Sequence, residues 1–324
     1  MLPAERDFYL TQSVHSDPGG ETPGLGERLA ALPTDPGELA LLVRHLLLHR
    51  EEAGRFGCAL PESRYRQEAE TRYISDIIDT ITDYDAAELT APRRPLDRFA
   101  GTCRDFALLH CSLLRHTGTP ARIRCGYATY FAPGFYDDHW VTEYHDPYRG
   151  WTLADPQLVP DPRIEDAYDT DFDPLDVPRD RFLPAGECWR RCRTGEAEPH
   201  DFGVAVLGLT GQWMVRGNVL RDLAALNRAE VLPWDTWGLG VRTPGGEEPT
   251  EEQLAVVDEA ARVTVEADFE RLRALYLETP ELRMPETVTS YPSFENRPCE
   301  VRLRDGERAS SGAESDGSAS GSGH

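Results

Sequence analysis

Residues 101–107 read Gly-Thr-Cys-Arg-Asp-Phe-Ala, and this stretch predicts the start of a helix that carries a cysteine in its first turn. Two prolines break the segment before it, and Thr102 is available as the N-cap. Apolar residues then recur at helical spacing until Gly118 and Pro120 end the helix. The thiol of Cys103 would lie near unpaired backbone N–H groups and the positive end of the helix dipole, and both stabilise a thiolate. The alternative is a small buried core residue, which is the usual role of a free cysteine.

Length and charge limit the classes of protein to consider. The chain has 324 residues, enough for one large domain or two ordinary ones with a sizeable core. The net charge is -23, and all 34 basic residues are arginine, which suggests a GC-rich genome. Because the chain is so acidic, we expect neither nucleic acid nor an anionic membrane as a partner.

The pattern of the chain also predicts its compartment. No stretch approaches the roughly 20 apolar residues that a membrane helix needs, and residues 1–7 lack the basic-then-apolar pattern of a signal peptide. The seven cysteines are odd in number and scattered, which fits reduced thiols. We therefore expect a cytoplasmic bacterial protein.

The segments before Cys103 favour helices with structural roles. Residues 1–35 predict an irregular N-terminal segment with scattered apolar side chains. Pro36 begins a helix with an apolar stripe up to Leu47, and a second helix is expected from Ser63 to Tyr84. Residues 88–99 are the connection to the cysteine helix.

Beyond Pro120 the apolar period changes from 3.6 to 2, which indicates strands. We expect one strand near residues 122–129, a loop over 131–138, and a second strand over 139–144. A turn then leads to a third strand, 151–155, which Pro156 ends.

The remaining chain predicts fewer elements. Residues 156–186 are rich in Asp and Pro and are expected to run over the surface. Residues 203–209 predict a strand, and residues 218–228 predict a helix. A capping box at Thr250 opens a helix expected to continue to about Leu277.

If strands 139–144 and 151–155 form a hairpin about Pro147, the numbers of opposed residues sum to about 294. His139 is then opposite Asp155, and a slip of two residues would still leave both on one face as diagonal neighbours. A carboxylate beside an imidazole fixes its tautomer and stabilises the imidazolium. Cys103, on the helix packed against this sheet, can supply a nucleophile.

Other histidines fit this arrangement less well. His110 lies two turns along the helix from Cys103, roughly 10.5 Å of rise, which is too far for direct proton transfer. His116 is further still, and His145 shares the face of His139 only if the strand continues past Tyr144. The alternative for His139 itself is a structural histidine at a strand end, tied to a carboxylate.

Three motifs resemble the transglutaminase-like superfamily. Residues 101–107, followed by Leu-Arg-His-Thr-Gly-Thr-Pro-Ala-Arg at 114–122 and Gly-Tyr at 126–127, resemble its nucleophile segment. Asp-His-Trp-Val-x-Glu at 138–143 resembles its histidine segment, and Gly-Trp-x-Leu-x-Asp-Pro at 150–156 resembles its aspartate segment. The motifs stand in the family's order and cover roughly residues 95–160.

The resemblance implies an α+β fold with a cysteine-protease-like core, in which the nucleophile helix packs on an antiparallel sheet, with extra N- and C-terminal helices. It implies Cys103 as nucleophile, His139 as general base and acid, and Asp155 as the orienting carboxylate. We expect a single globular domain over 1–303. Within it we expect a transglutaminase-like core over about 62–160 and a helical C-terminal extension over about 200–280. Residues 304–324 are expected to be a disordered tail.

The chemistry implied is covalent acyl transfer or hydrolysis on an amide, ester or thioester, through a thioester intermediate that water or an amine resolves. We expect a peptide, amide or acyl-carrier substrate and no cofactor or metal. The backbone N–H of Cys103 would be the first hydrogen-bond donor to the oxyanion. Arg98 and Arg104 either assist in stabilising the oxyanion or are arginines at the surface. Four aromatic residues either contact the substrate or only pack in the fold: Phe131, Phe135, Tyr136 and Trp140.

Two other functions stay open. Cys188, Cys192 and His200 could belong to a zinc site, although no second paired ligand set follows at a recognised spacing. The fold could also serve as a non-catalytic binding or scaffolding module. No acidic layout matches the calcium site of the animal crosslinking enzymes, so calcium dependence is not expected.

Overall fold

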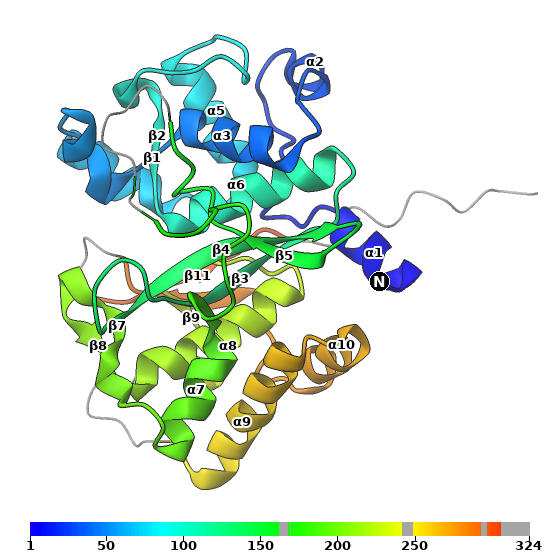
Figure 1. Ribbon diagram of the computed structural model, residues 1–324, viewed down its shortest axis with the longest axis vertical. Helices are drawn as coiled ribbons and strands as arrows, with labels where there is room; N and C mark the ends of the chain where they lie inside the picture. The colour runs from blue at the N-terminus through cyan, green and yellow to red at the C-terminus, as the bar shows by residue number, and fades with distance from the viewer. Residues whose placement is uncertain (162–167, 169, 242–248, 293–296, 306–324) are drawn as a thin grey trace, which may run out of the picture.

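The computed structural model describes residues 1–161, 168, 170–241, 249–292 and 297–305. Figure 1 shows a central sheet between two helical layers: α2, α3, α5 and α6 lie on one side, and α7 to α10 lie on the other. Helices and sheets are thus mixed in one α+β arrangement, and the predicted fold class is confirmed. Among the described residues, no helix combines the length and apolar character needed to cross a membrane.

The helices follow the expected order, with more breaks than the sequence pattern indicated. The α-helices are α1 (Pro3–Leu10), α2 (Leu25–Ala30), α3 (Pro36–Leu46), α4 (Glu62–Gln67), α5 (Ile74–Tyr84), α6 (Cys103–His116), α7 (Ala185–Thr194), α8 (Gln212–Leu226), α9 (Glu251–Glu266) and α10 (Phe269–Glu278). Short 3₁₀ helices are η1 (Arg50–Phe56), η2 (Glu68–Glu70), η3 (Pro95–Asp97), η4 (Pro199–Asp201), η5 (Ala205–Leu207) and η6 (Gly238–Gly240).

Two expected long helices are each interrupted. The helix predicted over 63–84 breaks before α5, where Arg72 leaves the helical path to bind the buried carboxylate of Asp235 at 2.7 and 3.0 Å. The helix predicted over 250–277 breaks at Ala267, whose φ is 52°, and Asp268 caps the new helix by accepting the N–H of Arg271. In both places a tertiary contact or a cap outweighs the continuous apolar pattern.

The strands are β1 (Leu47–His49), β2 (Phe99–Gly101), β3 (Ala121–Ala128), β4 (Tyr136–Asp146), β5 (Gly150–Ala154), β6 (Phe182–Pro184), β7 (Phe202–Val204), β8 (Leu209–Thr210), β9 (Asp235–Thr236), β10 (Thr287–Ser290) and β11 (Cys299–Arg302). The central sheet has the order β6-β3-β4-β7-β8, and β5 also pairs with β4. Only the β4–β7 pair is parallel in this sheet. The expected strand 203–209 is thus two short strands joined by η5.

The β4–β5 hairpin differs in register from the prediction. Glu143 lies opposite Leu153, so paired numbers sum to 296 instead of 294. β4 also continues to Asp146, past the predicted end at Tyr144. On this edge of β4, β5 covers residues 142–146 and β7 covers 136–137. In the described chain this leaves the stretch around His139 without a strand neighbour on that edge.

The cysteine helix α6 packs on this sheet through an apolar core. Phe106 of α6 belongs to the same buried cluster as Ile123 of β3 and Trp140 of β4, and each has an exposure of 1% or less. The hydroxyl of Thr142 in β4 also donates to the carbonyl of Ala107 at 3.0 Å. This combination fixes the start of α6 relative to β4.

Two segments differ from their predicted character, one in burial and one in secondary structure. Residues 157–159 follow β5 and are all buried, as is Asp161. Residues 162–167 and 169 of the same predicted surface segment lie outside the described residues. Residues 1–35 contain α1 and α2 rather than only irregular chain.

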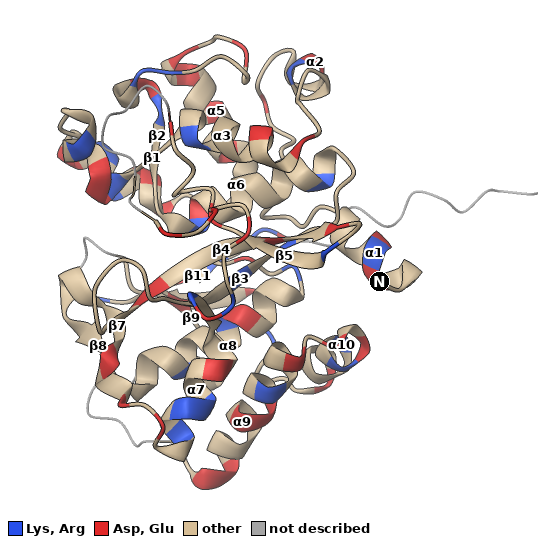
Figure 2. Cartoon of the chain, viewed as in Figure 1, with Lys and Arg blue, Asp and Glu red and all other residues tan. Residues whose placement is uncertain are grey.

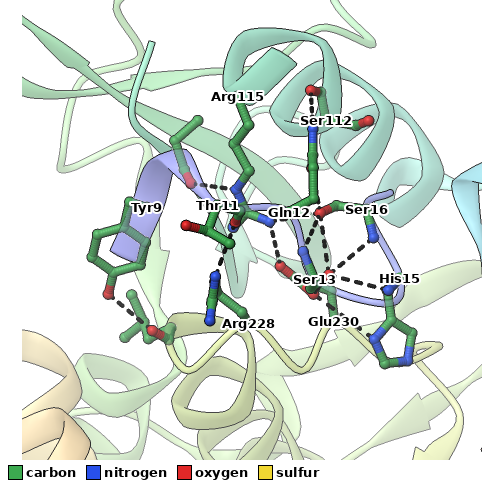
Figure 3. Close-up of polar contacts among 12 residues, drawn as sticks. Tyr9, Thr11, Gln12, Ser13, His15, Ser16, Ser112, Arg115, Arg228 and Glu230 are labelled. Atoms are coloured by element: carbon green, nitrogen blue, oxygen red, sulfur yellow. Dashed lines mark hydrogen bonds and ion pairs between the residues drawn. The ribbon is translucent and has the colours of Figure 1, made fainter. Parts of the chain in front are cut away.

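Polar contacts tie the N-terminal segment between α6 and the end of α8 (Figure 3). Tyr9 donates to the carbonyl of Leu226 at 2.9 Å, and Ser13 donates to Glu230 at 2.6 Å. Arg115 of α6 binds the second oxygen of Glu230 at 3.0 Å. Because Tyr9, Arg115 and Glu230 are buried, the segment joins the two helical layers instead of wrapping loosely around them.

Buried arginines bind the sheet to the C-terminal layer. Arg122 and Arg124 both contact Glu143 of the neighbouring strand, at 2.8 and 3.3 Å, and Arg124 also forms a bidentate pair with Asp222 of α8. A planar guanidinium suits such paired contacts. The charges along α7 and α9 in Figure 2 form exposed pairs such as Arg262–Glu259, which contribute little by comparison.

The predicted tail lies outside the described residues from 306 onward. Arg304, at its expected start, binds both oxygens of Asp76 and lies over the ring of Tyr73. The prediction of one domain over 1–303 stays a prediction.

Candidate active site

The start of α6 is built to hold Cys103 in place. Strand β2 leads into Thr102, and the carboxylate of Asp105 accepts both the N–H and the hydroxyl of Thr102, at 2.8 and 3.1 Å. Gly101 leaves room for this carboxylate, because a Cβ at this position would lie 2.9 Å from an oxygen of Asp105. Cys103 therefore occupies the first helical position, where backbone N–H groups have no partner within the helix.

The side chains of His139 and Asp155 are in contact, as the predicted hairpin required, although β4 and β5 pair in a register shifted by two residues. His139 lies in β4, Asp155 follows β5, and Nε2 of the imidazole is 2.7 Å from Oδ2 of the carboxylate. Both residues are buried, with exposures of 2% and 0%. Because a carboxylate only accepts hydrogen bonds, Nε2 carries the proton and Nδ1 is the remaining ring nitrogen.

Cys103 lies at the imidazole and is the partly exposed member of the three. Burial alone would lower the pKa of His139. The charge and hydrogen bond of Asp155, together with the hydrogen bond and charge of Cys103, outweigh burial and raise this pKa to about 10. The imidazole is then protonated at neutral pH. The structure thus brings the three predicted site residues together, with an imidazolium between sulfur and carboxylate.

Asp155 has two further donors that the sequence did not identify. The hydroxyl of Tyr130 donates to Oδ2 at 2.7 Å, and the backbone N–H of Gln157 donates to Oδ1 at 3.1 Å. The side-chain amide of Gln157 binds Glu52 at 2.6 Å, and Glu52 in turn accepts from Arg44 at 3.1 Å. The N–H of Gln157 makes a local turn contact, two residues after Asp155, whereas the contacts of Tyr130 with Asp155 and of the Gln157 side chain with Glu52 join segments that are distant in the sequence.

His49 is a second unexpected neighbour of the site. Its strand, β1, pairs in parallel with β2, and this pairing places His49 opposite Gly101, two residues before the cysteine. The charges of His49 and His139 interact, and burial lowers the pKa of His49. Its ring therefore favours the neutral form beside the imidazolium of His139.

The four predicted substrate-contact residues have different surroundings. The ring of Phe131 lies edge-on against His139, with centroids 4.9 Å apart. Tyr136 stacks on Phe202 at 4.5 Å, and Trp140 is buried in the core with 1% exposure. Phe135 is partly exposed. Phe131 is thus the one placed against the candidate site.

Arg98 and Arg104 are not surface residues. Their exposures are 2% and 0%. Arg98 donates to the carbonyl of Arg44 at 2.8 Å, and Arg104 donates to the carbonyl of Arg72 at 2.6 Å. Both side chains join segments of the N-terminal layer, so the surface alternative is wrong.

The competing histidines have other partners. His110 is fully buried and contacts the carbonyl of Pro36 at 3.1 Å; burial lowers its pKa to about 4. His145 shares the face of His139, because β4 continues past Tyr144, and its ring lies edge-on against Trp151.

The proposed zinc residues do not form a cluster. His200 bonds the hydroxyl of Thr210 at 3.1 Å, and the thiol of Cys188 contacts the carbonyl of Leu183 at 3.8 Å. Within the described ranges, no group of three or more His, Cys, Asp or Glu residues is arranged to hold a metal ion.

A cavity of about 770 Å³ lies apart from the three site residues, lined by residues such as Glu5, Trp151, Arg179 and Arg191. Its central charges are paired: Glu143 accepts from Arg122 and from Arg179, at 2.8 and 2.6 Å. These lining charges are therefore already paired with one another.

The arrangement defines a cysteine-centred site: a thiol at a helix start, an imidazole and a carboxylate on paired strands, in an α+β fold. Residues 62–156 match the model of the transglutaminase-like superfamily, so the resemblance of the three motifs to this cysteine-dependent catalytic family is confirmed for this segment.

One solved structure resembles part of this chain. A crystal structure of a candidate cysteine protease from Cytophaga hutchinsonii is similar at 18% sequence identity and a TM-score of 0.30. The match covers 56% of this chain and 46% of that protein, less than half of its length. No curated protein matches this chain.

Proposed function

We propose that this chain is an enzyme that transfers or hydrolyses acyl groups through Cys103, His139 and Asp155. The proposal rests mainly on His139, whose imidazole interacts with two groups. Its Nε2 donates a hydrogen bond to Asp155, and the ring also interacts with Cys103. Histidine with a carboxylate on one side and a nucleophile on the other is the general arrangement of covalent acyl transfer.

The first half-reaction starts from a thiolate and an imidazolium. The sulfur of Cys103 attacks the carbonyl carbon of an amide, ester or thioester, and the electron pair of the C=O bond moves to oxygen. As the tetrahedral intermediate collapses, the bond to the leaving group breaks, and Nδ1–H of His139 gives that group its proton. The products are a thioester on Cys103 and a neutral imidazole.

The second half-reaction reverses the proton transfer. The neutral imidazole takes a proton from water or an amine, which attacks the thioester, and Cys103 leaves as a thiolate beside the restored imidazolium. Asp155 keeps the ring oriented through both steps. The unpaired backbone N–H of Cys103 at the helix start is placed to stabilise the oxyanion.

Mass spectrometry of the intact protein tests the proposal. The protein would be incubated with p-nitrophenyl esters, acyl thioesters and amidated peptides, and Cys103→Ala would serve as the control. We expect an acyl mass on wild type that neutral hydroxylamine removes, and none on the variant. Added primary amines would then separate transfer from hydrolysis. A folded wild-type protein without adduct or turnover on any donor would instead favour the non-catalytic module.

A further inference from the structure

Tyr130 contacts the carboxylate at the far side of the candidate site. It lies in the loop between β3 and β4, and its hydroxyl donates to Oδ2 of Asp155 at 2.7 Å. The same oxygen accepts Nε2–H of His139, also at 2.7 Å. The aromatic ring is held between Phe131 and Phe172, with centroid distances of 4.8 and 5.2 Å, and lies edge-on to His139. Oδ2 of Asp155 therefore accepts hydrogen bonds from two donors.

We propose that Tyr130 is a positioning residue that limits how strongly Asp155 holds the proton on His139. The inference rests on the proposed function, since it concerns the acid strength of the proton donor in that reaction. A phenol that shares Oδ2 withdraws part of its negative charge. The imidazolium is then less stabilised than by an unshared carboxylate and remains a better acid for the leaving group.

The surroundings make the hydroxyl a permanent donor. Burial, with the charge of Asp155 and its hydrogen bond, raises the pKa of Tyr130 well above its usual value. Asp155 is also fixed independently, because the N–H of Gln157 holds its other oxygen at 3.1 Å. Loss of the phenol would thus change the charge on Oδ2 while leaving the carboxylate in place.

Other charges around the pair must stay constant in any test. The titratable and charged groups that interact with His139 or Tyr130 come from several elements: Cys103 of α6, His49 of β1, Asp137 and Asp138 of β4, Asp155 after β5, and Arg181 before β6. A Tyr130→Phe substitution alters none of them and preserves the ring packing.

The chain offers a matched control. Tyr127 in β3 is fully buried, and within the described residues its hydroxyl has no hydrogen-bond partner. Tyr127→Phe removes an equivalent group that does not contact Asp155. The comparison separates the hydrogen bond from the general loss of a buried hydroxyl.

The experiment is an NMR titration of the His139 imidazole in the full chain carrying Cys103→Ser, which removes the contribution of the sulfur. We expect Tyr130→Phe to raise the pKa of His139 by about one unit, and Tyr127→Phe to leave it unchanged. A merely structural role for Tyr130 would lower the melting temperature without this shift. An unchanged or lowered pKa of His139 in Tyr130→Phe overturns the inference.

A second titration of His139, in the wild-type chain, separates this inference from the proposed function. If the imidazole of the wild-type chain titrates near the ordinary 6.5 and Cys103 reacts like any thiol, the proposed function fails. If it titrates far above 6.5 but does not respond to Tyr130→Phe, only the role of Tyr130 is wrong.

Discussion

Replacing Asp155 by Asn should remove the charge that keeps His139 protonated. The side chain keeps its shape, and its oxygen can still accept Nε2–H. Because His139 is 2% exposed, burial is then opposed by the weaker hydrogen bond and charge of Cys103, and the pKa of His139 should fall from about 10 toward 6.5. A full change to 6.5 would be on the order of 5 kcal/mol of imidazolium stabilisation.

The consequence can be measured at the sulfur. Without an imidazolium beside it, Cys103 loses the partner that activates it as a nucleophile. The rate of alkylation by iodoacetamide at pH 6.5, followed by peptide mass spectrometry, should therefore fall by about tenfold or more. Glu259→Gln, which removes a carboxylate of an exposed ion pair on α9, should leave the rate close to wild type. Undiminished alkylation of Cys103 in Asp155→Asn would refute this reasoning.

Two further predictions concern the frame of the site. Gly126→Ala should lower the free energy of unfolding by about 1–3 kcal/mol or more in urea titrations, because a Cβ there would lie 2.2 Å from the carbonyl oxygen of Leu183. Gly26→Ala, in α2, whose Cβ meets nothing within 4 Å, should be neutral or slightly stabilising; equal effects of the two substitutions would contradict this. Burial lowers the pKa of His15 to about 4. Between pH 6.5 and 4, His15 of the unfolded chain therefore binds a proton, whereas His15 of the folded chain does not. Stability should fall by roughly 3 kcal/mol over that range, and His15→Gln but not exposed His116→Gln should flatten the pH dependence of unfolding. An unchanged slope in His15→Gln would count against it.

That His139 and Asp155 lie close together could be predicted from local patterns, whereas the strand register could not. Period-two alternation was enough to place His139 and Asp155 on one face. The turn was expected about Pro147, but the carboxylate of Asp146 accepts the N–H groups of Tyr148 and Arg149, at 2.8 and 2.9 Å. Gly150 then follows with φ +78°, which makes the loop one that shifts the pairing by two residues.

The features that sequence reasoning missed depend on tertiary contacts. Tyr130 contacts Asp155 only because the fold brings the loop between β3 and β4 to the end of β5. Likewise, the helix break before α5 depends on Arg72 reaching Asp235, which lies 163 residues further along the chain. The hydrophobic periodicity of a sequence predicts which face of a helix or strand is buried. It does not predict which polar group from a distant segment contacts that face.

The pH dependence of iodoacetamide labelling in the wild-type chain tests the central claim most directly. Burial raises the pKa of Cys58, Cys111, Cys125, Cys188 and Cys192, so these thiols should remain slow at pH 6.5. The account predicts that Cys103 is labelled at this pH at least tenfold faster than any of them. Labelling of Cys103 that appears only near pH 8.5, in step with an ordinary thiol, would contradict it.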